Sequence, residues 1–173
     1  NVWIPDSSLG AYNGVEAIND SVAYIISNRG FLIKTEDAGL SWSNIPVPNP
    51  IQWWSIQFLN DSVGWLGDIN GRVIKTTDGG NSWITLNATD MDKPARVTFS
   101  DENNGYAASF RDFYQTSDGG LSWTQIASNI FATNLKALQI IDDSTLYAAV
   151  TGRFYQSTDS GQTWTLQQPH PFG

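Results

Sequence analysis

The chain has 173 residues, no cysteine, one histidine and a formal net charge of −8. This acidic balance argues against nucleic acid as a partner, because binding to a phosphate backbone requires a concentrated basic surface. The lack of cysteine excludes disulfides and thiolate metal sites, and no apolar run approaches the ~20 residues of a membrane span, so we expect no metal, no cofactor and no membrane insertion.

The first residues, Trp3-Ile4-Pro5, resemble the segment that follows the first motif below, Trp42-Ser43-Asn44-Ile45-Pro46. The chain is therefore expected to begin at the end of an earlier repeat. Four units follow at about residues 13–48, 54–89, 95–129 and 136–168. We take residues 1–173 as a single repeat domain or as a segment of one.

Each unit contains a motif of the form [Ser/Thr]-x-Asp-x-Gly-x-[Ser/Thr]-Trp, called the box below, at residues 35–42, 76–83, 116–123 and 157–164. The box aspartates at 37, 78, 118 and 159 give steps of 41, 40 and 41 residues. An aromatic residue that follows an acidic one by four positions recurs upstream of each box, at Tyr24, Trp65, Tyr106 and Tyr147. A period in this range indicates supersecondary units that must stack to bury their apolar faces.

Each unit reads as four short strands separated by turn residues, and no stretch has a helical apolar period. In the second unit we predict strands near 55–59, 63–67, 72–76 and 82–86, with the box as the last turn. This pattern predicts an all-β fold, a β-propeller of four-stranded antiparallel blades. Four repeats either close a four-bladed ring, continue in further blades, or pair with another chain.

The box is interpreted as structural. Its Asp accepts hydrogen bonds from its own turn, its Gly adopts a positive φ, and its Trp packs on the blade and supplies most of the stability. The residues are Asp37, Gly39, Trp42, Asp78, Gly80, Trp83, Asp118, Gly120, Trp123, Asp159, Gly161 and Trp164. One carboxylate per blade at the rim makes neither a calcium site nor a glycosidase pair, so no catalytic residue is assigned.

Two features of the opposite face are candidates for recognition. Arg29, Arg72, Arg111 and Arg153 each fall at or beside the turn between the second and third strands, so they could bind carboxylates of a partner or of an acidic glycan. Trp53, Trp54 and Phe131 fall in the connections between blades, 47–54 and 128–134, where an exposed aromatic could contact a protein or a sugar ring. Strand alternation allows only one of the two adjacent tryptophans to point inward.

The repeats, such as GWLGDINGRVIKTTDGGNSW at residues 64–83, resemble the Asp-box, or bacterial neuraminidase repeat, and are most similar to the photosystem II assembly/stability factor-like propellers. The resemblance implies a propeller of typically seven blades that is usually exported, binds protein partners and has no catalytic centre. The box also occurs in sialidases, sortilin-type receptors and xyloglucanases. The sialidase Arg-Ile-Pro signature is absent here, and the nearest segment is Asn44-Ile45-Pro46.

The sequence and the resemblance together favour a non-enzymatic, extracytoplasmic scaffold that binds a protein partner. The alternative is a carbohydrate-binding module, or a segment of a glycosidase or sialidase-type propeller, with a glycan as the partner.

Overall fold

The computed structural model describes residues 7–86, 96–109, 112–130 and 135–167, and within them it forms four antiparallel sheets of four strands each. The one helical element of these residues is a 3-10 turn, η1 (Ser7–Leu9), at the start. Within the described ranges, no helix is long and apolar enough to cross a membrane. The predicted all-β class and the blade architecture are confirmed. The resemblance of 1–6 to a preceding strand lies outside the described residues.

Each blade is a meander in which consecutive strands pair in sequence order. Blade 1 contains β1 (Tyr12–Ala17), β2 (Ala23–Ser27), β3 (Leu32–Thr35) and β4 (Ser43–Asn44). Blade 2 contains β5 (Trp53–Phe58), β6 (Gly64–Asp68), β7 (Val73–Thr76) and β8 (Ile84–Leu86). Blade 3 contains β9 (Arg96–Phe99), β10 (Gly105–Ala108), β11 (Phe113–Thr116) and β12 (Thr124–Ala127). Blade 4 contains β13 (Leu135–Ile140), β14 (Leu146–Val150), β15 (Arg153–Ser157) and β16 (Thr165–Gln167).

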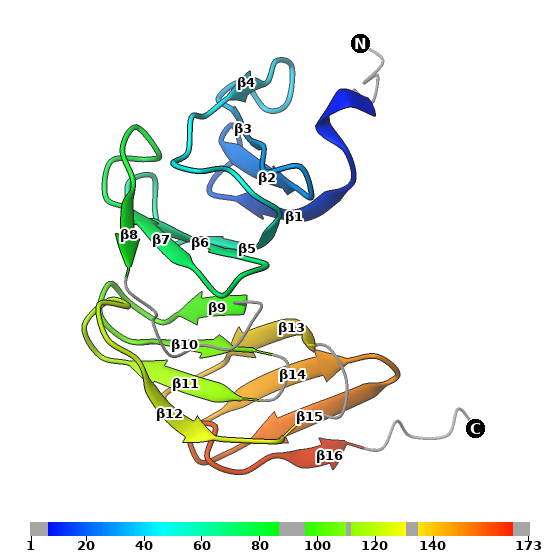
Figure 1. Ribbon diagram of the computed structural model, residues 1–173, viewed down its shortest axis with the longest axis vertical. Helices are drawn as coiled ribbons and strands as arrows, with labels where there is room; N and C mark the ends of the chain where they lie inside the picture. Colours follow the sequence, from blue (N-terminus) through cyan, green and yellow to red (C-terminus); the bar gives the residue numbers. More distant parts are fainter. Residues whose placement is uncertain (1–6, 87–95, 110–111, 131–134, 168–173) are drawn as a thin grey trace.

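The blades follow one another around an axis in the arrangement of a four-blade β-propeller, with blade 1 and blade 4 at the two ends of an arc (Figure 1). The first strand of each blade is innermost. Three clusters of buried hydrophobic side chains hold the blades together, one at each junction from blade 1 to blade 4. Among the described residues, no such cluster joins blade 4 back to blade 1.

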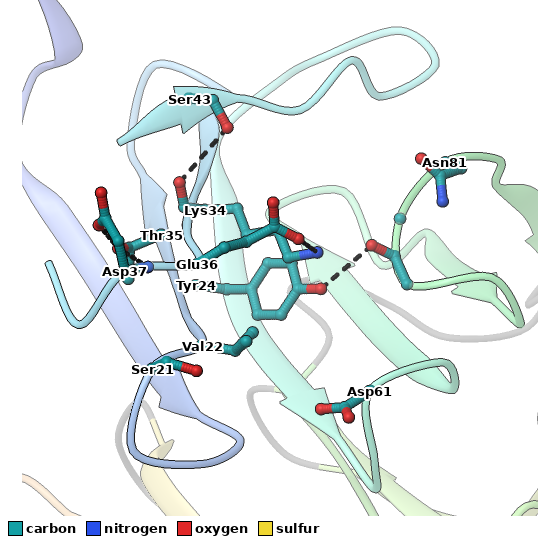
Figure 2. Close-up of polar contacts among 12 residues, drawn as sticks. Ser21, Val22, Tyr24, Lys34, Thr35, Glu36, Asp37, Ser43, Asp61 and Asn81 are labelled. Carbon is teal, nitrogen blue, oxygen red and sulfur yellow. Dashed lines mark hydrogen bonds and ion pairs between the residues drawn. The ribbon is translucent and has the colours of Figure 1, made fainter. Parts of the chain in front are cut away.

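The junction between blades 1 and 2 depends on one aromatic side chain of β2 (Figure 2). Tyr24 is fully buried, stacks on Phe58 of the next blade at a centroid distance of 4.2 Å, and donates its hydroxyl proton to the carbonyl of Gly79 at 3.1 Å. Lys34 lies 5.4 Å from the Tyr24 ring centre and pairs with Glu36 at 2.7 Å. One side chain thus contacts both the innermost strand and the box turn of the following blade.

The second junction repeats this arrangement with different side chains. Trp65 stacks on Phe99 at 3.8 Å, and its indole N–H donates to the carbonyl of Gly119 at 3.1 Å. At the third junction, Tyr106 stacks instead on Phe113 of its own blade at 5.4 Å. At the first two junctions the aromatic residue that recurs before each box therefore joins a blade to its successor, and at the third junction Tyr106 is part of the buried cluster shared by blades 3 and 4.

Hydrogen bonds within each box fix the last turn of the blade. In the second box, one carboxylate oxygen of Asp78 accepts hydrogen bonds from the hydroxyl of Thr76 and the backbone N–H of Ser82, both at 2.8 Å. The Gly80 N–H donates to the Thr76 hydroxyl at 2.9 Å. The same bonds form around Asp37, Asp118 and Asp159.

These bonds favour the charged form of the carboxylates. The Ser82 hydroxyl and backbone lower the pKa of Asp78, and the Ser122 hydroxyl and backbone lower the pKa of Asp118 to about 2. A carboxylate held as an anion by its own turn is unsuited to general acid catalysis at neutral pH. The geometry agrees with the structural interpretation of the box.

The box tryptophans, which we expect to pack on the blade and to supply most of the stability, are all half-buried in the structure. Trp83 is half-buried and meets the edge of the Phe58 ring at 6.3 Å. The fully buried aromatic side chains include Trp53, Trp65 and Tyr24 instead. The reason is that the box indole lies at the rim of the junction, whereas side chains of the inner two strands lie between two blades.

Candidate binding site on the propeller axis

The predicted arginine ring is not a set of equivalent free cations. The Arg29 guanidinium donates to the carbonyl of Ser8 at 2.9 Å, while Arg153 is exposed at the start of β15. Arg111 lies outside the described residues. The described members therefore have different environments, and a common carboxylate-binding role does not follow from their spacing.

Arg72 is the clearest correction to that prediction. Its Nε donates to a carboxylate oxygen of the fully buried Asp68 at 2.7 Å, and its two terminal nitrogens donate to the carbonyls of Pro48 and Asn49 at 3.0 and 2.8 Å. The guanidinium also lies 5.3 Å from the centre of the Trp53 ring. Arg72 neutralises a buried charge and fixes the connection into blade 2, so it is unavailable to a partner.

The two adjacent tryptophans both lie in β5 rather than in the connection before it. Trp53 is fully buried and donates its indole proton to the carbonyl of Gly30 at 2.8 Å, so it is a core residue and the prediction of surface recognition is wrong for it. Trp54 is half-buried and faces the propeller axis. Phe131 lies outside the described residues.

Trp54 lines a cavity of about 200 Å³ to which all four innermost strands contribute residues. We call this cavity the axial cup, and its polar lining includes Asn13 from β1, Arg96 from β9 and Lys136 from β13. These residues lie near the starts of their strands. Since the box is the turn after the third strand of a meander, the cup opens on the face opposite the boxes.

Arg96 is the most unusual group in the cup. Its Nε donates to the carbonyl of Leu135 at 2.9 Å, and its guanidinium lies 5.5 Å from the centre of the Trp54 ring. Burial lowers the pKa of Arg96 to about 10, so the side chain remains positively charged at neutral pH. Burial of a cation is costly without a partner of opposite charge.

No carboxylate of the described chain compensates this cation. The ion pairs of the described residues join Lys34 to Glu36 and Arg72 to Asp68, and neither involves the cup. Lys136, the second cation of the lining, is exposed. In a protein with a net charge of −8, the cup thus brings together two cations and an indole, an arrangement suited to a carboxylate-bearing ligand.

Reasoning from sequence identified Trp54 but missed Arg96 and Lys136. A signal was present. When the innermost strands are aligned on Phe58 and Phe99, Arg96 falls in the same position as Ser55, and Lys136 in the same position as Trp54. A search for positively charged residues in the innermost strands, rather than at the turns between the second and third strands, would therefore have identified the cup.

A second cavity, of about 270 Å³ between blades 3 and 4, is lined by Asp101, Asp142 and Asp143. Backbone N–H groups and side chains of their own turns lower the pKa of both Asp101 and Asp142, chiefly Asn104 for the first and Ser144 for the second. A retaining or inverting glycosidase needs one carboxyl group that stays protonated as an acid. Asp101 and Asp142 do not meet that requirement.

Comparisons with known proteins agree with the fold. The family model described as photosynthesis system II assembly factor YCF48 matches residues 40–173. The structure of YCF48 bound to D1 peptide is 14% identical, with a TM-score of 0.61, over 91% of this chain and 82% of that chain. YCF48 from Cyanidioschyzon merolae is 15% identical, with a TM-score of 0.71, over 93% of this chain and 57% of that chain.

An ancestral GH74 enzyme is 18% identical, with a TM-score of 0.73, over 94% of this chain and 24% of that chain. The chain thus spans less than two thirds of this enzyme and of the Cyanidioschyzon merolae protein. At these identities the likeness concerns the fold alone. No curated protein matches the chain.

Proposed function

Because the chain belongs to the photosynthesis system II assembly factor YCF48 family, we propose that it is a non-enzymatic scaffold that binds an acidic segment of a partner protein in the axial cup. A propeller of similar fold, YCF48, has been solved bound to D1 peptide, which supports a peptide as the kind of ligand. The observation that carries the proposal is the half-buried Arg96, which has no carboxylate partner among the described residues.

The cup provides the contacts that such a ligand requires. The terminal nitrogens of Arg96 offer donors to a ligand carboxylate, and Lys136 adds a second positive charge at the cavity wall. Trp54 provides an apolar surface, and the cation–π contact with its ring helps to orient the Arg96 guanidinium. An aspartate or glutamate side chain would therefore be bound with its methylene groups against the indole.

The test measures fluorescence anisotropy of a fluorescein-labelled peptide of alternating Asp and Gly on titration with the protein. We expect binding that weakens with added salt, and Arg96→Gln should raise Kd by about tenfold or more, since a charge-assisted hydrogen bond contributes about 1.5–3 kcal/mol. Arg153→Gln is the matched control because Arg153 is exposed and away from the cup.

A matching peptide with Asn in place of Asp should bind at least about tenfold more weakly for the same reason. If Arg96→Gln binds the acidic peptide as tightly as the unsubstituted chain, the cup is not the site. If the Asn peptide binds as tightly as the Asp peptide or more tightly, the acidic chemistry proposed for the ligand is wrong.

The second candidate function is carbohydrate binding, as a module or as a segment of a glycosidase-type propeller. The fold likeness to GH74 enzymes and the Trp54 ring in the cup favour it. Stacking of a neutral sugar on an indole is insensitive to salt, whereas the carboxylate contact is not. Binding of xyloglucan oligosaccharides that persists at high salt and in Arg96→Gln, or their hydrolysis, would favour this alternative.

We also propose an extracytoplasmic location, which the resemblance of the repeats to exported propellers supports. Fractionation of the source cells with an antibody to this chain tests it. Recovery of the protein only in the cytoplasmic fraction would refute the location without affecting the binding proposal.

A further inference from the structure

The cavity of about 270 Å³ between blades 3 and 4 lies on the face of the propeller that carries the boxes. Its walls come from the turn between β9 and β10, from β10 and β11, and from the end of β13 and the turn after it. Because consecutive strands of a blade are antiparallel, the turn after the first strand and the box turn after the third lie at the same end. This cavity, called the junction pocket below, is therefore separate from the axial cup on the opposite face.

At the first two blade junctions, a lysine side chain occupies the corresponding place. Lys34 pairs across the strands with Tyr24, and its Nζ lies 5.4 Å from the centre of the Tyr24 ring (Figure 2). Lys75 pairs in the same way with Trp65, and its Nζ lies 4.8 Å from the centre of the Trp65 ring. Each ammonium group is thus held over the aromatic ring that joins its blade to the next.

Oxygen atoms complete the surroundings of both ammonium groups. The Lys34 Nζ lies 2.7 Å from a carboxylate oxygen of Glu36, and the Lys75 Nζ donates to the carbonyl of Glu102 at 3.0 Å. Glu102 lies in the turn after the innermost strand of the following blade, so Lys75 bridges its junction. This place in the repeat therefore binds a primary ammonium group from within the chain at both junctions.

The third junction has the aromatic ring but not the lysine. Gln115 pairs with Tyr106 as the two lysines pair with their aromatic partners, so a shorter and uncharged side chain takes the lysine position. Both Tyr106 and Gln115 line the junction pocket. The pocket thus corresponds to the space that a lysine side chain fills at the other two junctions.

Ser160 supplies the structural hydrogen bond of the missing lysine, but not its charge. This residue holds the position of Gly119 in the repeat, and its hydroxyl donates to the carbonyl of Asp143 at 2.9 Å. At the second junction, Lys75 donates to the corresponding carbonyl, that of Glu102. Blades 3 and 4 therefore form this contact without a lysine, and the positive charge is not replaced.

The acidic residues of the junction pocket have no cation in their surroundings. Asp101 comes from blade 3, and Asp142 and Asp143 come from blade 4. Among the described residues that line the pocket there is no lysine, arginine or histidine, and neither ion pair of the described chain involves these aspartates. The pocket therefore keeps the aromatic ring and the oxygen acceptors of an ammonium site, with added negative charge.

We propose that the junction pocket binds a primary alkylammonium group, such as a lysine side chain of a partner protein or a free diamine, in the place that Lys34 and Lys75 take at the other junctions. The ammonium group lies against the Tyr106 ring and donates to the aspartate carboxylates, while the methylene groups of the ligand pack on Ile140. The site is independent of the acidic ligand proposed for the axial cup, because the two cavities open on opposite faces.

Fluorescence anisotropy of a fluorescein-labelled peptide of alternating Lys and Gly, titrated with the full chain, tests the pocket. Gln115→Lys restores the lysine of the other junctions, so its own Nζ should fill the pocket and raise the peptide Kd by about tenfold or more. Gln156→Lys is the matched control, since it adds the same charge at the equivalent position of blade 4, outside the pocket. Equal peptide binding by the two variants would overturn the proposal.

Asp143→Asn provides a second variant, which removes a carboxylate from the pocket without filling it. It should also raise the Kd of the Lys peptide by about tenfold. The same peptide with every lysine acetylated keeps its length but loses its charge, and it should bind at least about tenfold more weakly. An acetylated peptide that binds as tightly as the unmodified one would show that the ligand is not an ammonium group. Circular dichroism checks that each variant is folded.

Competition with cadaverine distinguishes the two sources of the ammonium group. Displacement of the peptide by cadaverine at a concentration similar to the peptide Kd assigns the pocket to free amines, and displacement only at a concentration at least about tenfold higher assigns it to lysine side chains. If neither the Lys peptide nor cadaverine binds, the proposal is refuted. Gln115→Lys should leave binding of the acidic Asp and Gly peptide unchanged, so failure of this site is distinguishable from failure of the cup.

Discussion

Replacement of Gly161 by alanine tests whether the junction between blades 3 and 4 is packed as tightly as its contacts indicate. Gly161 has a φ of 87°, and an added methyl group would overlap Cε1 of Phe113. That ring cannot move freely, since it is fully buried, stacks on Tyr106 and meets the edge of Trp164 at 5.1 Å. Gly161→Ala therefore combines backbone strain with a steric overlap.

Gly152→Ala separates the two costs. Gly152 also has a positive φ, of 71°, but no atom lies within 4 Å of the added methyl group. Backbone strain alone should lower the free energy of unfolding by about 1–2 kcal/mol. Overpacking typically adds about 1–3 kcal/mol, so Gly161→Ala should cost about 2–5 kcal/mol. The smaller entropy of the unfolded chain is common to both variants and cancels in the difference.

Urea denaturation followed by circular dichroism, with all proteins at one concentration, measures both free energies. The reasoning is refuted if Gly161→Ala costs no more than Gly152→Ala. A second check introduces Phe113→Leu into the Gly161→Ala protein. If overlap is the cause, the double variant should be more stable than the sum of the single losses predicts.

Three further predictions concern single side chains. Trp83→Phe should cost about 1 kcal/mol more in urea unfolding than Trp123→Phe, because the Trp83 indole donates to a carbonyl at 3.1 Å whereas the buried Trp123 Nε1 has no hydrogen-bond partner among the described residues. The pKa of Asp118 is about 2 in the fold against about 3.9 unfolded, so its contribution is complete above about pH 4 and is lost as pH falls toward 2. The urea midpoint should fall over that range, and less steeply in Asp118→Asn. Arg72→Met should lower the free energy of unfolding by about 3–5 kcal/mol by leaving the buried Asp68 unpaired, and adding Asp68→Asn should recover part of this loss.

The blades were predictable because the chemistry that fixes them is local. The Asp78 carboxylate bonds groups within four residues of itself, and the positive φ of Gly80 belongs to the same turn. A motif of eight residues therefore carries the whole turn. The strand alternation between turns is likewise readable from sequence, and the predicted bounds of the second unit differ from β5–β8 by two residues or fewer.

The site was less predictable because it depends on which side of a strand each residue takes. A register shift between Trp53 and Ser55 changes the phase of alternation in β5, so Trp53 enters the core while Trp54 faces the axis. Arg72 could have been assigned to Asp68, which lies four positions earlier. The role of Arg96 depends on Leu135, on another blade and 39 residues away, so it required the assembled propeller.

Among the described residues, the buried clusters at the three blade junctions couple the four blades as a linear array of nearest neighbours. Blades 2 and 3 are each stabilised from two sides, and blades 1 and 4 from one. Hydrogen exchange of the isolated chain should therefore be fastest in β1–β4 and β13–β16, because local opening starts where a unit has fewer neighbours. Any contact that covers both ends would make the array cyclic and equalise protection among the four blades.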